Sequence, residues 1–219
     1  MYIEGLLKPF GELALYQGYA QKMSEGLTPY IDFFPEYPPV ALWLFKLANI
    51  FGAEWFTLMW YGMVALATVG IMVLIKKLKG NPYIYLACVL PLAGLYWDRF
   101  DVFAALFSLL AVYLAKRDYK VFPTIVLGFG IMTKIYPIIL LPVILLMIFY
   151  KHSLRTAINS LIWFVIFMAI FISNSNGFVK TLFSYHGHRG IQIESIKSMP
   201  LLFKEDSTVE FQHGTYEIK

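Results

Sequence analysis

Charged residues are scarce in this sequence. Asp, Glu, Lys and Arg together make up 15% of its 219 residues, whereas 59% are hydrophobic and 18% are aromatic. A soluble domain needs more charge than this to cover its surface. Residues 55–75 and 161–172 contain no ionised side chain. Runs of this kind are typical of segments that contact lipid, so the sequence predicts an integral membrane protein.

Cysteine is nearly absent as well. The single cysteine, Cys88, lies inside an apolar stretch, which excludes a disulfide framework and a cysteine metal site. The net charge of +4 comes from basic residues that form short clusters between apolar segments. Membrane topology explains this pattern better than a nucleic-acid interface does, so no nucleic-acid partner is expected.

Segment lengths predict how the chain crosses the membrane. Residues 55–75 are long enough to cross once. A continuous helix over residues 83–115 would extend roughly 50 Å, which exceeds a hydrocarbon core of about 30 Å. The chain must therefore fold back, and the polar string W-D-R-F-D at 97–101 supplies the turn.

The same argument applies to residues 121–150, which would extend about 45 Å as one helix. The string T-K-I-Y-P at 133–137 lies at their centre and predicts a second hairpin. A last crossing at 158–173 brings the predicted bundle to about six spans.

The basic clusters predict the orientation, because lysine and arginine are retained on the cytoplasmic side. Six alternating crossings place the clusters at 76–79, 116–120 and 151–155 inside. The two hairpin tips, at Asp98 and Lys134, then lie outside. If 121–150 were instead one kinked helix, the cluster at 151–155 would move outside and break the charge rule.

Three regions follow from this topology. Residues 1–54 form an extracytoplasmic loop, 55–173 the transmembrane core, and 174–219 an extracytoplasmic loop or tail that continues into further helices. No apolar segment or signal peptide precedes the first region to carry it outside. We therefore expect the sequence to be a fragment, with at least one more transmembrane helix before it.

The first region contains two predicted amphipathic helices on the membrane surface. Between Pro9 and Gly26, apolar residues recur at helical spacing, and residues 40–51 form the second helix, with Trp43 as an interface anchor. Four prolines make residues 26–39 a rigid loop rather than a helix. The apolar residues of the first helix are Leu13, Tyr16, Ala20, Met23 and Leu27.

Four strings together resemble a known family. They are G-L-T-P-Y-I-D-F-F-P-E-Y-P-P at 26–39, W-D-R-F-D at 97–101, T-K-I-Y-P at 133–137 and R-G-I-Q-I-E-S at 189–195. In this order, the strings resemble the polyprenol-phosphate-dependent glycosyltransferases of the C superfamily, and among them the alpha-mannosyltransferase-like family 87. The resemblance covers nearly the whole chain. It implies transfer of a hexose, by analogy mannose, from a polyprenyl phosphate to a lipid or glycan acceptor.

Such a transfer needs a carboxylate to take the proton of the acceptor hydroxyl. The resemblance implies the acidic residue that begins a D-L-x-x-Y string, which here reads E-L-A-L-Y from Glu12 to Tyr16. Glutamate departs from that pattern by one methylene. Asp32 is the second candidate base. In the alternative interpretation, Glu12 is a first-turn acid that favours the helix dipole, and Asp32 and Glu36 cap and solvate a proline-rich loop.

The transfer also needs cations or N–H donors to hold the departing phosphate. Arg189 is the preferred one, because its guanidinium matches phosphate geometry, and Lys134 and Arg99 complete the set. Alternatively, Lys134 snorkels to the surface, Asp98 is an N-cap with Asp101 three residues on, and Arg99 pairs with one of them. The predicted substrate-binding residues are Tyr16, Glu36, Tyr37, Asp98, Arg99, Asp101, Lys134, Tyr136, His186, His188, Arg189, Gln192 and Glu194.

Two further expectations concern the tail. Gln192 and Glu194 alternate with isoleucines, which predicts a strand or an extended loop that faces the site. A zinc site at His186 and His188 would need further ligands, and none has suitable spacing. We expect no metal and no cofactor besides the donor substrate.

The sequence therefore predicts an all-α, polytopic transmembrane helical bundle of the C-superfamily type, with two outer-face hairpins. Its expected partners are membrane lipids, a polyprenyl-phosphate sugar and a glycan or glycolipid acceptor, at the outer face of a prokaryotic plasma membrane. The alternatives are an inactive fragment, or a transporter or lipid flippase, whose charges would line a path near the bilayer midplane. Here the charges cluster at the outer ends of helices, which favours the transferase.

Overall fold

The computed structural model describes residues 11–175, 177–188, 191–192, 209–212 and 215–218, with side chains described up to residue 184. The chain divides into two compact units, Met1–Phe178 and Val179–Lys219. The first holds the helical bundle and the candidate site.

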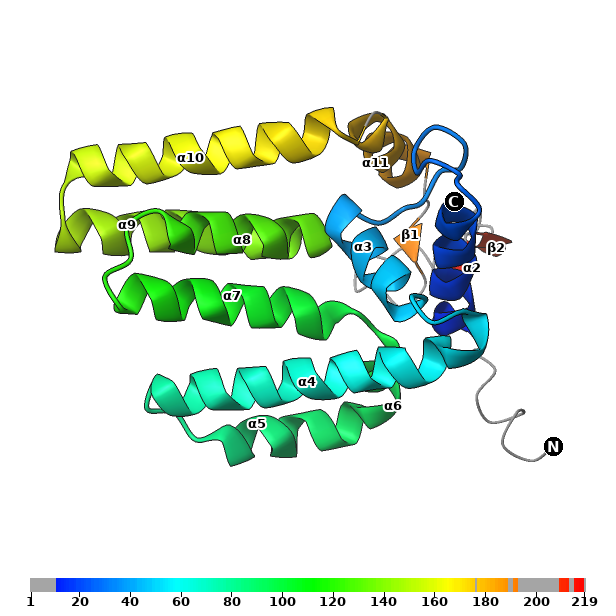
Figure 1. Cartoon of the computed structure of the whole chain (residues 1–219), viewed down its shortest axis with the longest axis horizontal. Helices are drawn as coiled ribbons and strands as arrows, with labels where there is room; N and C mark the ends of the chain where they lie inside the picture. The colour runs from blue at the N-terminus through cyan, green and yellow to red at the C-terminus, as the bar shows by residue number, and fades with distance from the viewer. Residues whose placement is uncertain (1–10, 176, 189–190, 193–208, 213–214, 219) are drawn as a thin grey trace. The chain divides into compact units, whose positions relative to one another are not determined.

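Apolar helices pass back and forth along one direction in the first unit (Figure 1). The connections 78–81, 117–121 and 152–153 lie at one end of the bundle, and the hairpin tips lie at the other. The helices are α4 (Phe56–Lys77), α5 (Pro82–Val89), η2 (Leu90–Leu92), α6 (Ala93–Asp98), α7 (Asp101–Lys116), α8 (Phe122–Thr133), η3 (Tyr136–Leu140), α9 (Leu141–Lys151) and α10 (Leu154–Ser173).

Both predicted hairpins are confirmed. Arg99, with φ −106° and ψ 150°, ends α6, and Lys134, with φ −154° and ψ 136°, ends α8. A single extended residue therefore interrupts the helix at each tip. Pro137 has no N–H to bond the Thr133 carbonyl four residues earlier, and its ring crowds that carbonyl, so α8 cannot continue through the tip. The segment 121–150 is thus two helices rather than one kinked helix.

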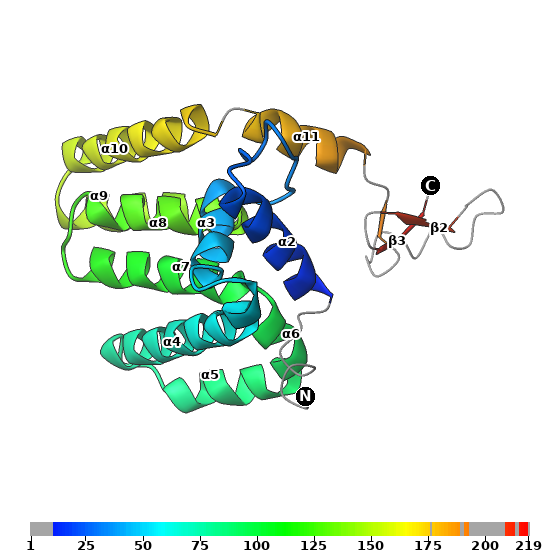
Figure 2. The ribbon, with the colours of Figure 1, turned by 45° about the vertical axis from the view of Figure 1, so that its right-hand side comes forward.

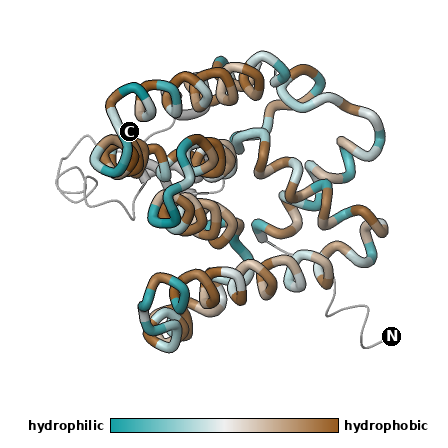
Figure 3. Tube along the Cα trace, turned by 60° about the vertical axis from the view of Figure 1, so that its left-hand side comes forward, coloured by the Kyte–Doolittle hydropathy of each residue, from teal (hydrophilic) through white to brown (hydrophobic). Residues whose placement is uncertain are grey.

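The bundle has the surface expected of a membrane protein. Ala53–Lys77 and Leu154–Ser173 are long and apolar enough to span a membrane. Large apolar side chains such as Leu66 (74% exposed) and Val165 (55% exposed) face outward, and Figure 3 shows hydrophobic colour along the helices. At about 1.5 Å per residue, the shorter helices fall below a hydrocarbon core of about 30 Å. That each of these shorter helices crosses the membrane stays a prediction.

Close contacts join α8 to α10. A Cβ atom added to Gly128 would lie 2.6 Å from the ring of Phe167. Thr124 Oγ1 donates a hydrogen bond to the Ser160 carbonyl oxygen over 3.1 Å. Ser160 Oγ is in turn hydrogen-bonded, at 2.6 Å, to the carbonyl oxygen of Lys120. Small residues and hydrogen bonds of this kind are typical of helix packing in lipid.

The segment before the bundle forms α2 (Glu12–Ser24), α3 (Pro39–Ala48) and η1 (Ala53–Trp55). The predicted apolar face of α2 is buried at Leu13, Tyr16, Ala20 and Met23, whereas Leu27 lies beyond the helix and is 39% exposed. This face packs on α3 and on the bundle rather than turning to the bilayer. Figure 2 shows α2 and α3 at the end of the passes where α4 begins.

The proline-rich loop is fixed at the same end. Residues 27–38 form turns and bends without a helix, as predicted. Tyr30 has a positive φ of 66°, and its ring centroid lies 5.4 Å from that of Phe178. Gly177, with φ +91°, approaches so closely that an added Cβ would lie 2.6 Å from the Tyr30 carbonyl oxygen. The loop before the bundle thus contacts the chain that leaves it.

The second unit contains α11 (Phe178–His188) from Val179 onward and a small sheet of β1 (Ile191–Gln192), β2 (Val209–Gln212) and β3 (Thr215–Ile218). The strand order is β1-β3-β2 and both pairings are antiparallel. Gln192 lies in a strand, one of the two conformations predicted for it, whereas Glu194 lies outside the described residues and the orientation of this segment toward the site stays a prediction. The sequence did not predict β2 and β3, which are an exception within the otherwise helical fold.

Candidate functional site

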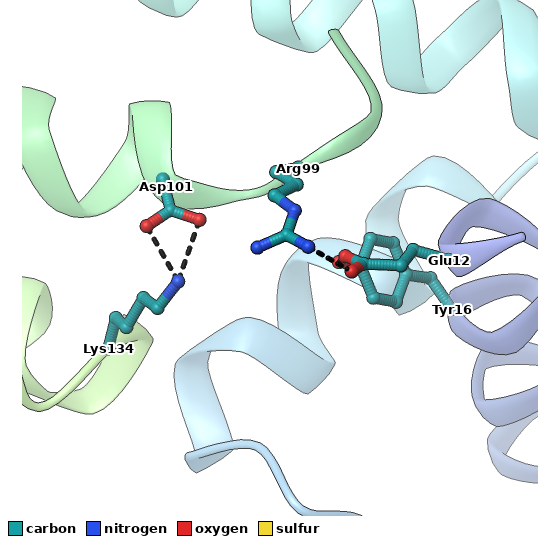
Figure 4. Close-up of polar contacts among 5 residues, drawn as sticks. All are labelled: Glu12, Tyr16, Arg99, Asp101 and Lys134. Atoms are coloured by element: carbon teal, nitrogen blue, oxygen red, sulfur yellow. Dashed lines mark hydrogen bonds and ion pairs between the residues drawn. The ribbon is translucent and has the colours of Figure 1, made fainter. Parts of the chain in front are cut away.

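Two ion pairs lie side by side at the hairpin end of the bundle (Figure 4). Glu12 Oε1 lies 2.7 Å from Arg99 Nη2, and the Tyr16 phenol donates a hydrogen bond of 2.6 Å to Glu12 Oε2. Lys134 Nζ contacts both carboxylate oxygens of Asp101, at 2.6 and 2.7 Å. Segments separated by up to 122 positions in the sequence therefore meet in one cluster.

Local structure explains where each charge lies. Glu12 is the first residue of α2 and Asp101 is the first residue of α7, positions at which the helix dipole favours a carboxylate. Lys134 follows the last residue of α8, where the dipole favours a cation. Arg99 is the extended residue between α6 and α7, so its side chain can leave the bundle toward α2.

A buried aromatic floor supports the cluster. The Tyr16 ring stacks on Phe45 with centroids 4.3 Å apart and also contacts Tyr37, Trp60 and Phe100. Lys134 Nζ lies 5.2 Å from the ring centroid of Phe100, a cation–π distance that links the floor to the second ion pair. These contacts hold the first hairpin tip, through Phe100, against α2 and next to the two ion pairs.

The charged side chains stay accessible to solutes. Glu12 and Arg99 are 39% and 47% exposed, and Asp101 and Lys134 are 44% and 37% exposed. Exposed ion pairs contribute little to stability, typically about 0–1 kcal/mol. An anionic ligand that binds Arg99 or Lys134 more tightly can therefore replace the carboxylate partner at a low cost in free energy.

The phenols beneath the cluster keep their protons. Burial raises the pKa of Tyr16 far above its usual value, and the hydrogen bond to the Glu12 carboxylate raises it further. Burial also raises the pKa of Tyr37, with the nearby Glu36 carboxylate adding to it. Burial raises the pKa of the half-buried Tyr19 to about 12, and the Glu36 carboxylate adds to this shift. These phenols therefore stay protonated at neutral pH.

The structure brings together Glu12, Arg99, Asp101 and Lys134, with Tyr16 and Tyr37 beneath them. The roles predicted for these residues in catalysis and substrate binding stay predictions. The alternative roles for the first tip are wrong in detail. Asp98 ends α6 and accepts a hydrogen bond of 3.0 Å from Tyr61, so it is not the N-cap of α7, a position that Phe100 takes. Arg99 pairs with Glu12 rather than with either aspartate.

Asp32 and Glu36 lie in the proline-rich loop. Asp32 is exposed, and its Oδ2 accepts a hydrogen bond of 2.7 Å from the backbone N–H of Thr28. This contact closes the loop, as the capping interpretation expects. Glu36 is half-buried beside Tyr37. Tyr136 is 45% exposed at the start of η3, next to the second tip.

The predicted tail residues belong to the second unit. His186 and His188 lie in α11 and Gln192 in β1, but their side chains fall outside the described part of the chain. Arg189 and Glu194 lie outside the described residues altogether. Their roles stay predictions. Within the part of the chain that the structure describes, no group of three or more His, Cys, Asp or Glu side chains is placed to hold a metal ion.

Sequence reading missed the aromatic floor and the Tyr61–Asp98 contact. It named Trp43 as an interface anchor and gave no role to Phe45 and Trp60, which are fully buried under the cluster. The available signal was the helical spacing of Tyr16 with Leu13 and Ala20, which placed its ring on the buried face.

Comparison with known proteins identifies the family of the chain. The family model of glycosyltransferase family 87 matches residues 34–207. The match includes Arg99, Asp101 and Lys134, and it begins after Glu12. No curated protein and no solved structure matches the chain. Because the family model covers most of the sequence, the chain belongs to glycosyltransferase family 87 and is a membrane glycosyltransferase.

Proposed function

We propose that this protein transfers a hexose, with mannose the first candidate, from a polyprenyl phosphate to a hydroxyl of a lipid or glycan acceptor. One observation carries the proposal: an accessible carboxylate, Glu12, lies at the same end of the bundle as two accessible cations, Arg99 and Lys134. A base and a phosphate-holding group are the two requirements of this chemistry.

The proposed reaction is a single inverting displacement. Glu12 takes the proton of the acceptor hydroxyl while the hydroxyl oxygen forms a bond to the anomeric carbon. The bond between that carbon and the phosphate oxygen breaks, and its electron pair leaves with the polyprenyl phosphate. Arg99 and Lys134 stabilise the charge that develops on this leaving group.

The ion pair between Glu12 and Arg99 is consistent with a site that has no donor bound. Arginine binds phosphate through two parallel hydrogen bonds, which a single contact to Glu12 does not match. When Arg99 turns from Glu12 to the donor phosphate, Glu12 Oε1 loses a cation that opposes its protonation. Donor binding therefore releases the base for the acceptor.

Charge placement supports a site outside the cytoplasm. The basic clusters at 76–79, 116–120 and 151–155 belong to the turns at the opposite end of the bundle. Lysine and arginine are retained on the cytoplasmic side, which supports an extracytoplasmic position for the Glu12 cluster. A prokaryotic plasma membrane is the proposed location. A transporter would need its charges along the passes, whereas this cluster lies at one end of them.

Donor competition tests the proposal. Membranes that contain the protein are given an acceptor-rich lipid extract and radiolabelled mannose, carried either by a polyprenyl phosphate or by a nucleotide diphosphate. We expect label in the acceptor from the polyprenyl-phosphate donor alone. Transfer from the nucleotide sugar alone would contradict the proposed donor, and preferential transfer of glucose or galactose would contradict mannose.

A further inference from the structure

We infer that Tyr16 is the positioning residue of Glu12: its phenol holds Oε2, which leaves Oε1 as the atom that takes the acceptor's proton. The inference rests on the proposed function, in which Glu12 is the base. It assigns Tyr16 a role exercised through Glu12 rather than through contact with substrate.

Helix geometry makes the pair. Glu12 and Tyr16 are four residues apart on the first turns of α2, so their side chains lie on the same helix face. The phenol oxygen lies 2.6 Å from Glu12 Oε2, a short hydrogen bond to a charged acceptor. Arg99 approaches the other oxygen at 2.7 Å. Each oxygen of the carboxylate therefore has a different neighbour.

The two neighbours differ in how freely they can move. Tyr16 is fully buried, and four aromatic side chains from the α2–α3 loop, α3, α4 and the first hairpin tip surround its ring. Arg99 is 47% exposed at the end of a long side chain. A phosphate can draw Arg99 away, whereas Tyr16 stays. The fully buried ring also has no face left for a substrate.

The chemistry of the phenol fits a fixed donor. Burial and the Glu12 carboxylate raise the pKa of Tyr16, so the phenol keeps its proton at any pH at which the protein works. It can donate to Oε2 but cannot accept the acceptor's proton. The proton must therefore arrive at Oε1, on the side that Arg99 now covers.

The length of the Glu12 side chain is part of this geometry. Removing one methylene would draw the carboxylate back by about 1.5 Å, one carbon–carbon bond length. An aspartate here would lose contact with Tyr16, with Arg99, or with both. The glutamate side chain is therefore long enough to contact Tyr16 and Arg99 at the same time.

Replacing Tyr16 by Phe tests the inference, and Tyr30→Phe is the matched control. Tyr30 is also buried, and its phenol donates a hydrogen bond of the same 2.6 Å length, but to the Tyr37 carbonyl oxygen. Both changes keep the ring and remove one phenol. We expect Tyr16→Phe to lower kcat by about 10- to 100-fold, as misplacement of a reacting group does. The donor KM should stay unchanged, and Tyr30→Phe should keep the wild-type kcat.

A further variant keeps the result decisive if Tyr16→Phe folds poorly. Replacing Tyr16 by p-aminophenylalanine restores a donor on the same ring and should recover most of the lost kcat.

The outcomes separate this inference from the proposed function. Wild-type kcat in Tyr16→Phe, alongside loss of transfer in Glu12→Gln, would overturn the positioning role and leave the base in place. Equal loss in Tyr16→Phe and Tyr30→Phe, without recovery by p-aminophenylalanine, would reduce Tyr16 to a packing residue. Full transfer by Glu12→Gln would remove the base and the inference together.

Discussion

At the scale of single residues, Arg99 should determine how tightly the donor binds. We expect Arg99→Gln to lower kcat/KM for the polyprenyl-phosphate donor by about 10- to 100-fold, the range for losing a hydrogen bond to a charged group. Arg99→Lys should retain part of the activity, because lysine supplies charge without the planar fork of arginine. Arg117→Gln, at the opposite end of the bundle, is the control. If Arg99 has no part in donor binding, steady-state kinetics with varied donor will show equal kcat/KM in all three variants.

The sequence could not indicate the partner of Arg99. Its position between two aspartates predicted a local ion pair, but the extended backbone at the tip directs the side chain to Glu12, 87 positions earlier. Asp101 and Lys134 were both predicted as site residues, yet nothing in either string indicates that they bind each other. Ion pairs between the two tips depend on how the helices pack, which a single sequence does not encode locally.

The buried phenols predict an alkaline limit to stability. The pKa values of Tyr16, Tyr19, Tyr30 and Tyr37 are all raised by burial. The unfolded chain loses these protons near pH 10, whereas the folded protein keeps them. Stability is therefore complete below about pH 10 and falls as pH rises through the folded values, which begin at about 12 for Tyr19.

Ultraviolet titration in detergent checks this limit. Phenolate absorbance should show that the exposed tyrosines ionise first and that the buried tyrosines ionise only when the protein unfolds. A single transition near pH 10 for all tyrosines, with helicity retained, would contradict the buried floor.

At the scale of elements, length arithmetic predicted the hairpins correctly because it depends on rise per residue alone. The predicted amphipathic stripe of α2 is also the buried stripe, but the sequence did not tell which apolar surface covers it. The answer, α3 and the aromatic floor, depends on tertiary packing. The small sheet after α11 was missed beyond Gln192, since short strands leave a weak periodic signal.

The α8–α10 contact should depend on the absence of a side chain at Gly128. Gly128→Ala places a Cβ 2.6 Å from the Phe167 ring, so we expect a loss of about 1–3 kcal/mol in the free energy of unfolding, as for other overpacked cores. Gly62→Ala is the control, because an added Cβ there meets nothing within 4 Å on α4. It should be neutral or stabilising. Equal unfolding curves for the two variants in mixed micelles would refute the close approach.

At the scale of the whole molecule, the family and the helical bundle are consistent with what composition and the four strings predicted. The side of the membrane rests on the charge rule, and impermeant thiol labelling tests it. In a Cys88→Ala background, Ile135→Cys at the second hairpin tip should react with an impermeant maleimide in intact cells. Lys120→Cys, at the opposite end, should react only after permeabilisation. The reverse pattern would place the site in the cytoplasm.

The central claim is that Glu12 is the base of the transfer site, and one pair of variants measures it directly. Glu12→Gln and Glu25→Gln remove one carboxylate each from the two ends of α2, and Glu25 is exposed and distant from Arg99. In membranes supplied with labelled mannosyl phosphoryl polyprenol, Glu12→Gln should abolish transfer while Glu25→Gln keeps the wild-type rate. Transfer by Glu12→Gln at the wild-type rate, at equal protein abundance, would contradict the account.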